Sequence, residues 1–154
     1  MLDIDARVRL AIQHQFIAAL PTPDVASVAA TLDAAVGDVA AAFDRLAVGR
    51  AIVLAPTSRD IVMSAPFAAG ATDFVVHVAE RRYYANCIWD ALGISVMLAG
   101  ADQPRDAEVR TSCADCGELL TILVRDGVAR ALPGDAVAHF AVPAARWWAD
   151  IGFT

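Results

Sequence analysis

Residues 81–93, Arg-Arg-Tyr-Tyr-Ala-Asn-Cys-Ile-Trp-Asp-Ala-Leu-Gly, are the stretch around which the chain is organised. The segment contains no proline and no glycine before Gly93, so it predicts a helix that includes Cys87 and Asp90. On a helix, this spacing places the thiol and the carboxyl on one face, one turn apart. A soft metal ligand beside a possible proton donor indicates a chemical site. The spacing also fits the commoner arrangement of a buried core thiol and a solvated carboxylate.

The composition indicates one domain of ordinary size, or two small ones that share a core. The chain has 154 residues, of which 58% are hydrophobic. No apolar run reaches the length of about 18 residues that suggests a membrane span. The N-terminal residues 1–7 are acidic, unlike a basic signal peptide, and three cysteines is an odd number that favours reduced thiols. We therefore expect a cytoplasmic protein without a membrane partner.

Residues 1–66 are predicted to form a winged-helix-like module of three helices and a β-hairpin. Apolar residues recur at helical spacing in the first part of this range, and two short β-prone runs follow it. The predicted helices run over 4–20, from Asp24 to about residue 32, and from a cap at Asp38 to Gly49; the predicted strands are 51–54 and 61–63.

Winged-helix modules commonly bind DNA, but the charges of this one argue against a nucleic-acid partner. Residues 1–70 hold five arginines against seven aspartates, and the net charge of the chain is −6. In the predicted third helix, where base-reading side chains would lie, Arg45 is flanked by Asp38 and Asp44. Because phosphate binding requires clustered cations, we expect the module to be structural.

The second half, residues 67–154, is predicted to be a small mixed sheet and helix domain, which makes the fold class α/β, of the α+β kind. Residues 64–72 are rich in small residues, proline and glycine, and are predicted to be a linker. The expected elements are a strand at 73–79 that leads straight into the Cys87 helix, a turn at 100–105, strands at 107–110, 119–124, 128–132 and 139–142, and a short helix at 144–151.

A C-x-x-C motif, Cys113-Ala-Asp-Cys116, lies between two of these predicted strands. A zinc site would need a second ligand pair, for which only Cys87 and the three histidines are available, at no familiar spacing. A redox dithiol would need a helix that starts at the first cysteine, whereas strands are expected on both sides. Two loop thiols that pack a turn remain the simplest interpretation, with metal binding as the alternative.

The order of the sequence motifs along the chain is more informative than any one of them. The winged-helix-like module is followed by Pro66-Phe67, Thr72-Asp73-Phe74-Val75-Val76, the string Arg81-Arg82-x-Tyr84-Ala85-x-Cys87-x-x-Asp90-x-Leu92, and Ser112-Cys113-Ala114 with Gly117. In this order the chain resembles the organomercurial (alkylmercury) lyase family through almost its whole length. The string that contains Cys87 and Asp90 is the specific part. The resemblance implies an α/β fold in which the winged-helix-like part packs against a mixed domain.

The resemblance implies protonolysis of a carbon–mercury bond, with Hg(II) and a hydrocarbon as products. Cys87 matches the family's first catalytic cysteine, which binds mercury as a soft thiolate. Asp90 matches the carboxyl that carries a proton to the departing carbon and then helps to hold Hg(II). The expected partner is an organomercurial or another thiol-reactive small molecule. No resident cofactor is expected; the metal bound is the Hg(II) product, or alternatively another soft metal.

The resemblance also implies a second catalytic cysteine, which falls beyond Gly152-Phe153-Thr154, where the sequence ends. We therefore expect a domain cut short at its C-terminus that binds mercurials but cleaves them poorly unless Cys116 substitutes. Cys113 matches a family cysteine regarded as structural, so Cys113 and Cys116 are weaker candidates for metal ligands. The alternatives are a soft-metal-sensing winged-helix transcriptional regulator, which the acidic third helix disfavours, and a non-catalytic metal-binding homologue.

Overall fold

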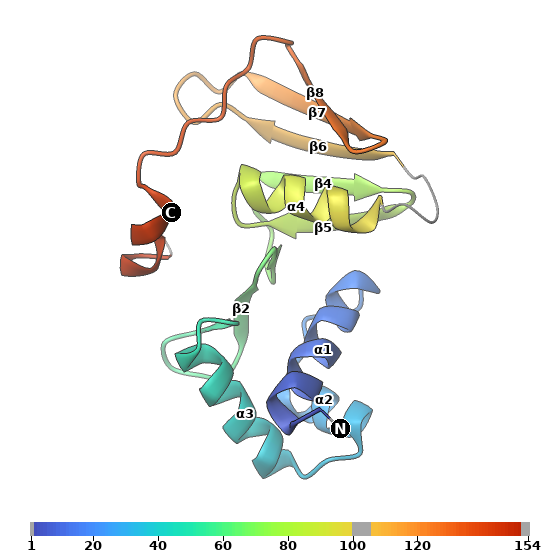
Figure 1. Ribbon diagram of the computed structural model, residues 1–154, viewed down its shortest axis with the longest axis vertical. Helices are drawn as coiled ribbons and strands as arrows, with labels where there is room; N and C mark the ends of the chain where they lie inside the picture. Colours follow the sequence, from blue (N-terminus) through green and yellow to red (C-terminus); the bar gives the residue numbers. More distant parts are fainter. Residues whose placement is uncertain (1, 100–105, 152–154) are drawn as a thin grey trace.

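The computed structural model describes residues 2–99 and 106–151 of the chain. Three helices occupy one end of the molecule, and an antiparallel sheet with one covering helix forms the rest (Figure 1). The chain therefore has the α+β fold that the sequence predicts. Among the described residues, no single helix is long and apolar enough to cross a membrane; α2 and α3 together meet that test but are bent by 117° at their junction.

The N-terminal helices are α1 (Ile4–Ile17), α2 (Val25–Leu32) and α3 (Val36–Val48). Helix α2 begins after Asp24, as predicted, and Asp24 caps it in a reciprocal capping box with Ser27. The prediction that Asp38 caps the third helix is wrong, because Ala35 is the N-cap of α3. Val36 and Gly37 already belong to the helix, so Asp38 lies in the first turn, where a negative charge suits the helix dipole.

One eight-stranded sheet runs through the molecule in the order β1-β2-β3-β5-β4-β6-β7-β8, and all its pairings are antiparallel. The strands are β1 (Val53–Leu54), β2 (Ile61–Ser64), β3 (Phe67–Ala68), β4 (Phe74–Val78), β5 (Arg81–Ala85), β6 (Ala107–Ser112), β7 (Leu119–Arg125) and β8 (Val128–Leu132).

The segment predicted to be a linker, residues 64–72, contains strand β3, so that part of the prediction is wrong. Phe67 pairs with Ala85 of β5 and is only 1% exposed. Its ring stacks on Phe16 of α1 at 5.4 Å between centroids and lies 5.9 Å from the ring of Tyr83. A large aromatic side chain is strongly driven into the core, so the segment joins the sheet despite its small neighbours. The division of the chain into domains at 66/67 stays a prediction.

The helix predicted over residues 81–93 begins only at Ile88, and the residues before Cys87 form strand β5. The chain turns at Ala79, whose φ is +52°, and returns along β4 with Val76 opposite Tyr83. Tyr83 and Ala85 are buried whereas Arg82 is exposed, which is the alternation of a strand. Pairing with β4 along five residues overrides the helical pattern, and the two adjacent tyrosines suit a strand. Helix α4 (Ile88–Leu98) then covers the face of β4, β5 and β6 (Figure 1).

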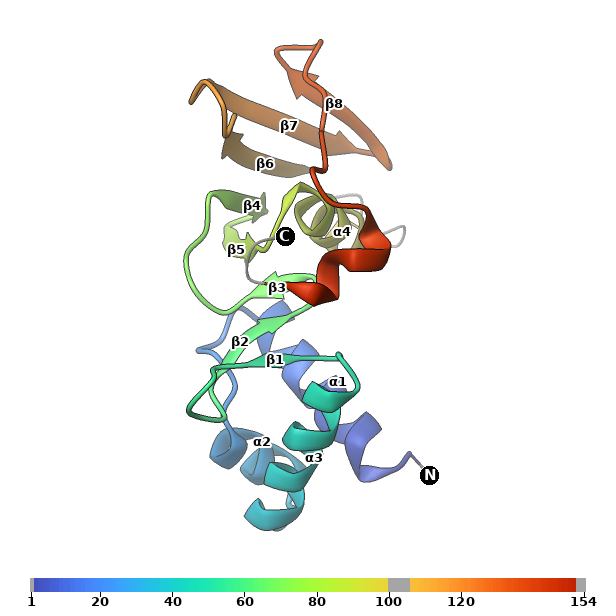
Figure 2. The same cartoon turned by 90° about the vertical axis from the view of Figure 1, so that its left-hand side faces the viewer.

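The C-terminal part follows the predicted order with one exception. Asp126 and Gly127 form the predicted hairpin turn between β7 and β8, both with positive φ (50° and 75°). Residues 139–142 are not a strand, and the short helix is the 3-10 helix η1 (Ala144–Ala149). η1 lies back toward the N-terminal helices, with the Arg50 guanidinium carbon 5.6 Å from the centre of the Trp148 ring (Figure 2). The turn predicted at 100–105 lies outside the described residues.

Candidate active site

Cys87 stands at the junction between β5 and α4, as the N-cap residue of α4. Its backbone is extended, with φ −154° and ψ 179°, so the prediction that Cys87 lies within a helix is wrong. Asp90 is the third helical residue, in the first turn of α4. An N-cap residue and the third helical residue face each other, as in a capping box, but Cys87 makes no side-chain capping hydrogen bond within the described residues. The structure therefore brings Cys87 and Asp90 together by a helix start rather than by a helix face.

The surroundings of Cys87 favour the protonated thiol. The side chain is half-buried, and burial raises the pKa of Cys87 above its ordinary value. The backbone N–H groups of Asp90 and Trp89 at the start of α4 oppose part of this effect, while the negative charge of Asp90 adds to it.

Asp90 is also biased toward its protonated form. Burial raises the pKa of its carboxyl, and hydrogen bonds from Asn86 and Cys87 offset part of the rise. Asn86 Nδ2 donates to Asp90 Oδ2 at 3.1 Å, which holds the carboxyl in place. The predictions from sequence did not include Asn86. In the sequence, Asn86 could have been noticed because it lies four residues before Asp90. Such a spacing is too common to indicate a contact by itself.

The end of β5 is fixed by a side chain from the segment before β4. Thr72 Oγ1 donates to the carbonyl oxygen of Ala85 at 2.6 Å and accepts the N–H of Phe74 at 3.3 Å. Ala85 is fully buried and precedes Cys87 by two residues. Thr72 thus satisfies the Ala85 carbonyl and the Phe74 N–H at this strand end. Because these bonds fix the end of β5, the chain enters the Cys87 turn from a fixed direction. Thr72 had no predicted role of its own, although it belongs to the motif that carries the resemblance.

Helix α4 is held against the sheet by an apolar face. Ala91 and Ile94 have no exposed surface, and Ser95 is buried with its hydroxyl donating to the Ala91 carbonyl at 2.8 Å. On β6, which α4 contacts, Thr111 is 9% exposed, and its Oγ1 has no hydrogen-bond partner among the described residues. The sheet strand β6 that α4 contacts therefore carries one buried hydroxyl without a partner among the described residues.

The second pair of cysteines lies in the loop between β6 and β7. Cys113 is half-buried, Cys116 is exposed, and neither forms a disulfide. The loop is closed by a bond from the Cys113 N–H to the Glu118 carbonyl (2.8 Å) and by one from the Gly117 N–H to the Cys113 carbonyl (2.9 Å). Backbone N–H groups of Cys116 and Asp115, and then the side chain of Cys116, lower the pKa of Cys113.

The four predicted site residues fall into two pairs. Cys87 pairs with Asp90, and Cys113 pairs with Cys116. In the described residues, Cys116 is not grouped with Cys87 and Asp90, so the structure does not place it as the substitute for a second catalytic cysteine. No group of three or more histidine, cysteine, aspartate or glutamate side chains in residues 2–99 and 106–151 is arranged to hold a metal. Each pair is therefore a two-ligand candidate, which suits a soft metal of low coordination number better than zinc.

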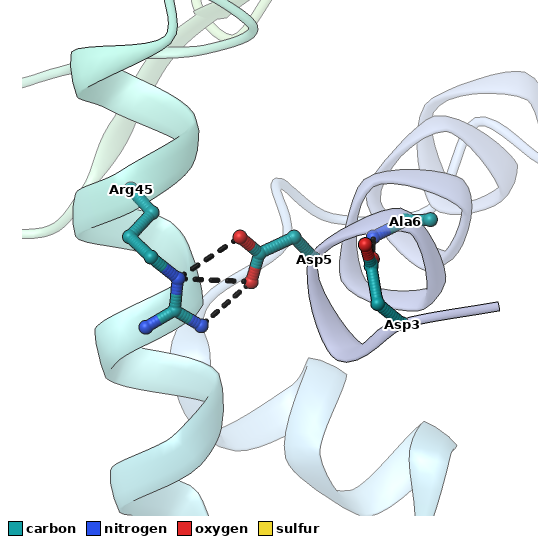
Figure 3. Close-up of polar contacts among 4 residues, drawn as sticks. All are labelled: Asp3, Asp5, Ala6 and Arg45. Atoms are coloured by element: carbon teal, nitrogen blue, oxygen red, sulfur yellow. Dashed lines mark hydrogen bonds and ion pairs between the residues drawn. The ribbon is translucent and has the colours of Figure 1, made fainter.

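Two of the five arginines in residues 1–70, Arg45 and Arg59, form ion pairs with aspartates. Arg45 of α3 binds Asp5 of α1 through two of its nitrogens, with Nη2 to Oδ1 at 2.6 Å and Nε to Oδ2 at 2.9 Å (Figure 3). Arg59 binds Asp44 in the same manner, with Nε to Oδ1 at 2.8 Å. Figure 3 also shows Asp3, whose carboxylate caps α1 by accepting the Ala6 N–H at 2.8 Å. The absence of a nucleic-acid partner stays a prediction, and these pairs agree with it.

Comparison with known proteins adds two findings. A family model described as alkylmercury lyase (MerB) matches residues 67–154, more than half of the chain. A solved structure, the crystal structure of the mercury-bound form of MerB2, aligns with a TM-score of 0.68 over 86% of this chain at 19% identity, a likeness that shows the shared fold. This chain spans 62% of that protein's chain. No curated protein matches.

Proposed function

The chain belongs to the alkylmercury lyase family, and from that premise we propose that it cleaves carbon–mercury bonds by protonolysis at Cys87 and Asp90. The observation that carries the proposal is the pairing of a half-buried thiol with a half-buried carboxyl at the β5–α4 junction. Both groups have raised pKa values, so each holds a proton more readily than a solvated counterpart.

The first step is capture of the organomercurial cation. The Cys87 sulfur forms a bond to mercury, and its proton passes to the neighbouring Asp90 carboxylate while the original counter-ligand leaves. Mercury is a soft metal and a thiolate is a soft ligand, so this exchange is favourable even for a thiol with a raised pKa. The raised pKa of Asp90 allows the carboxyl to retain the proton at this point.

The second step is proton delivery to carbon. The carbon–mercury bond breaks as its electron pair accepts the proton from Asp90, and the hydrocarbon departs. The Asp90 carboxylate then joins the Cys87 sulfur as a ligand of Hg(II). A positioned acid of suitable pKa contributes about 10²–10⁴-fold to such a transfer. The hydrogen bond from Asn86 keeps the carboxyl directed toward this position.

The test is the release of benzene from a phenylmercury salt, measured by gas chromatography with a small thiol present. We expect release by the native protein and loss of at least about a hundredfold in Cys87→Ser, because serine is a poor mercury ligand. Met97→Ser is the matched control, since Met97 is an exposed sulfur-containing residue on the same helix. Equal release from the native protein and from Cys87→Ser would refute the assignment.

A further inference from the structure

The Cys113–Cys116 loop presents two thiols that the proposed cleavage does not use. They occupy one tight connection between β6 and β7, closed by the two backbone hydrogen bonds at Cys113. Gly117 has a φ of +73°, a conformation that suits glycine and fixes the return of the chain into β7. Cys116 is exposed, so an ion can reach the pair from solvent. The loop therefore holds two free thiols together in a fixed and accessible turn.

The number of ligands selects the class of metal. Structural zinc requires four ligands, and the described residues supply no third histidine, cysteine, aspartate or glutamate to this pair. Two thiolates suit soft d¹⁰ ions that accept two nearly opposite sulfur ligands, of which Hg(II) is the example relevant to this family. With metal–sulfur bonds of roughly 2.3 Å, the two sulfurs would lie about 4 to 5 Å apart, a span that a C-x-x-C turn can reach.

The sheet register places this loop near the Cys87 turn. Phe74 of β4 pairs with Ala85 of β5, and the next residue, Val75, pairs with Arg110 of β6. The C-terminal ends of β5 and β6 therefore lie at the same end of the sheet, with only β4 between them. Two strand spacings amount to about 9 to 10 Å. Cys87 follows the end of β5, and Cys113 follows the end of β6.

From this placement we propose that Cys113 and Cys116 form a second, two-thiol site for Hg(II), which receives the metal from Cys87 and Asp90. The role as receiver rests on the proposed lyase function; the existence of the site does not. In the transfer, two mercury–sulfur bonds form, and the bonds from mercury to Cys87 and to Asp90 break. The two protons released by Cys113 and Cys116 return to the Cys87 sulfur and the Asp90 carboxylate. Mercury keeps its oxidation state, and the first site is ready for another substrate.

The site is tested in full-length Cys87→Ser, which lacks the proposed catalytic thiol. The reduced protein is titrated with Hg(II) in the presence of a competing monothiol, and the bound metal is examined by X-ray absorption spectroscopy. We expect one Hg(II) per monomer with two sulfur neighbours. Replacing Cys116 as well, by serine or by alanine, should remove this bound metal, and circular dichroism checks that both double variants remain folded. Zinc should not compete at equal concentration.

Two results would overturn the proposal. One is that Cys87→Ser retains no more Hg(II) than the variant in which all three cysteines are replaced. The other is that mercury bridges two chains, which size-exclusion chromatography would detect as a metal-dependent dimer. Because Cys87→Ser is inactive under the proposed mechanism, this experiment does not depend on hydrocarbon release. Benzene release by the native protein reports separately on the proposed function.

Discussion

The Cys87 turn and the Cys113–Cys116 loop lie at the same end of one sheet, but they shift the pKa of a cysteine thiol in opposite directions. Cys87 is packed at the start of α4, where burial raises its pKa, next to a carboxyl whose pKa burial also raises. Cys113 lies in a hairpin loop, where backbone N–H groups and Cys116 lower its pKa. The first environment retains protons, and the second favours the thiolate.

Under the proposed function, this difference separates two tasks of soft-metal chemistry within one fold. A proton that must reach a carbon atom is best held by groups that are reluctant to ionise, and the β5–α4 junction provides such groups. Uptake of a metal ion is favoured where the pKa of a thiol is lowered, and at the β6–β7 loop the pKa of Cys113 is lowered. Burial by helix α4 distinguishes the two places, so disturbing α4 should alter one and spare the other.

The largest expected effect comes from removing buried side-chain volume between α4 and the sheet. Ile94 is fully buried, and Ile94→Ala should lower the free energy of unfolding by about 3 kcal/mol through lost burial and a residual cavity. Val96→Ala is the control, because Val96 is 60% exposed on the same helix and should change stability by less than about 0.5 kcal/mol. Urea denaturation measures both. Similar values for the two variants would mean that α4 does not hold the Cys87 turn as described.

A smaller effect should appear in thiol reactivity. At pH 7, iodoacetamide should alkylate Cys113 in Cys87→Ser at least about tenfold faster than Cys87 in the variant with both loop cysteines replaced, because the thiolate is the reactive form. Mass spectrometry after timed quenching gives the two rates. Faster alkylation of Cys87 than of Cys113 would contradict the conclusion that the β6–β7 loop favours the thiolate and the β5–α4 junction the thiol.

The smallest effect is a pair of opposite pH dependences in the metal-free, reduced protein. Cys87 has a raised folded-state pKa, so its folded form binds a proton more tightly, and stability should fall as pH rises above the unfolded value of about 8.5. Cys113 has a lowered pKa, so its contribution should grow as pH rises toward that value and stay level above it. Comparing each cysteine-to-serine variant with the native protein between pH 6 and 10 isolates both slopes. Slopes of the same sign would contradict the assignment of the two environments.

Much of the fold was predictable because local signals agreed with tertiary packing. The helix after Asp24, the Asp126-Gly127 turn and the strand at 128–132 are each indicated by residues within the segment itself. The errors lie where packing overrides the local pattern. Phe67 draws a predicted linker into the sheet, and the Tyr83-Tyr84 pair turns the start of a predicted helix into β5. Neither outcome follows without knowing which strand lies alongside.

At the site, the pairing of Cys87 with Asp90 was expected, although for a different reason than the one found. Two residues three positions apart face each other when both lie on one face of a helix. They also face each other when the first is the N-cap and the second is the third helical residue, as in a capping box. Asn86 and Thr72 could not be assigned positions because their contacts depend on where β5 ends. The unpaired hydroxyl of Thr111 is visible only once α4 covers β6.

The most direct test of the central claim separates mercury capture from proton delivery by means of Asp90→Asn. Asparagine preserves the size of the side chain but cannot act as the acid. In Asp90→Asn protein whose Cys113 and Cys116 are also replaced by serine, one equivalent of phenylmercury is added, and mass spectrometry of the intact protein should show the phenylmercury group retained on Cys87, the remaining thiol. Benzene release should fall at least about a hundredfold below that of the native protein. If Asp90→Asn releases benzene at the native rate, the proton does not come from Asp90, and the proposed mechanism is wrong.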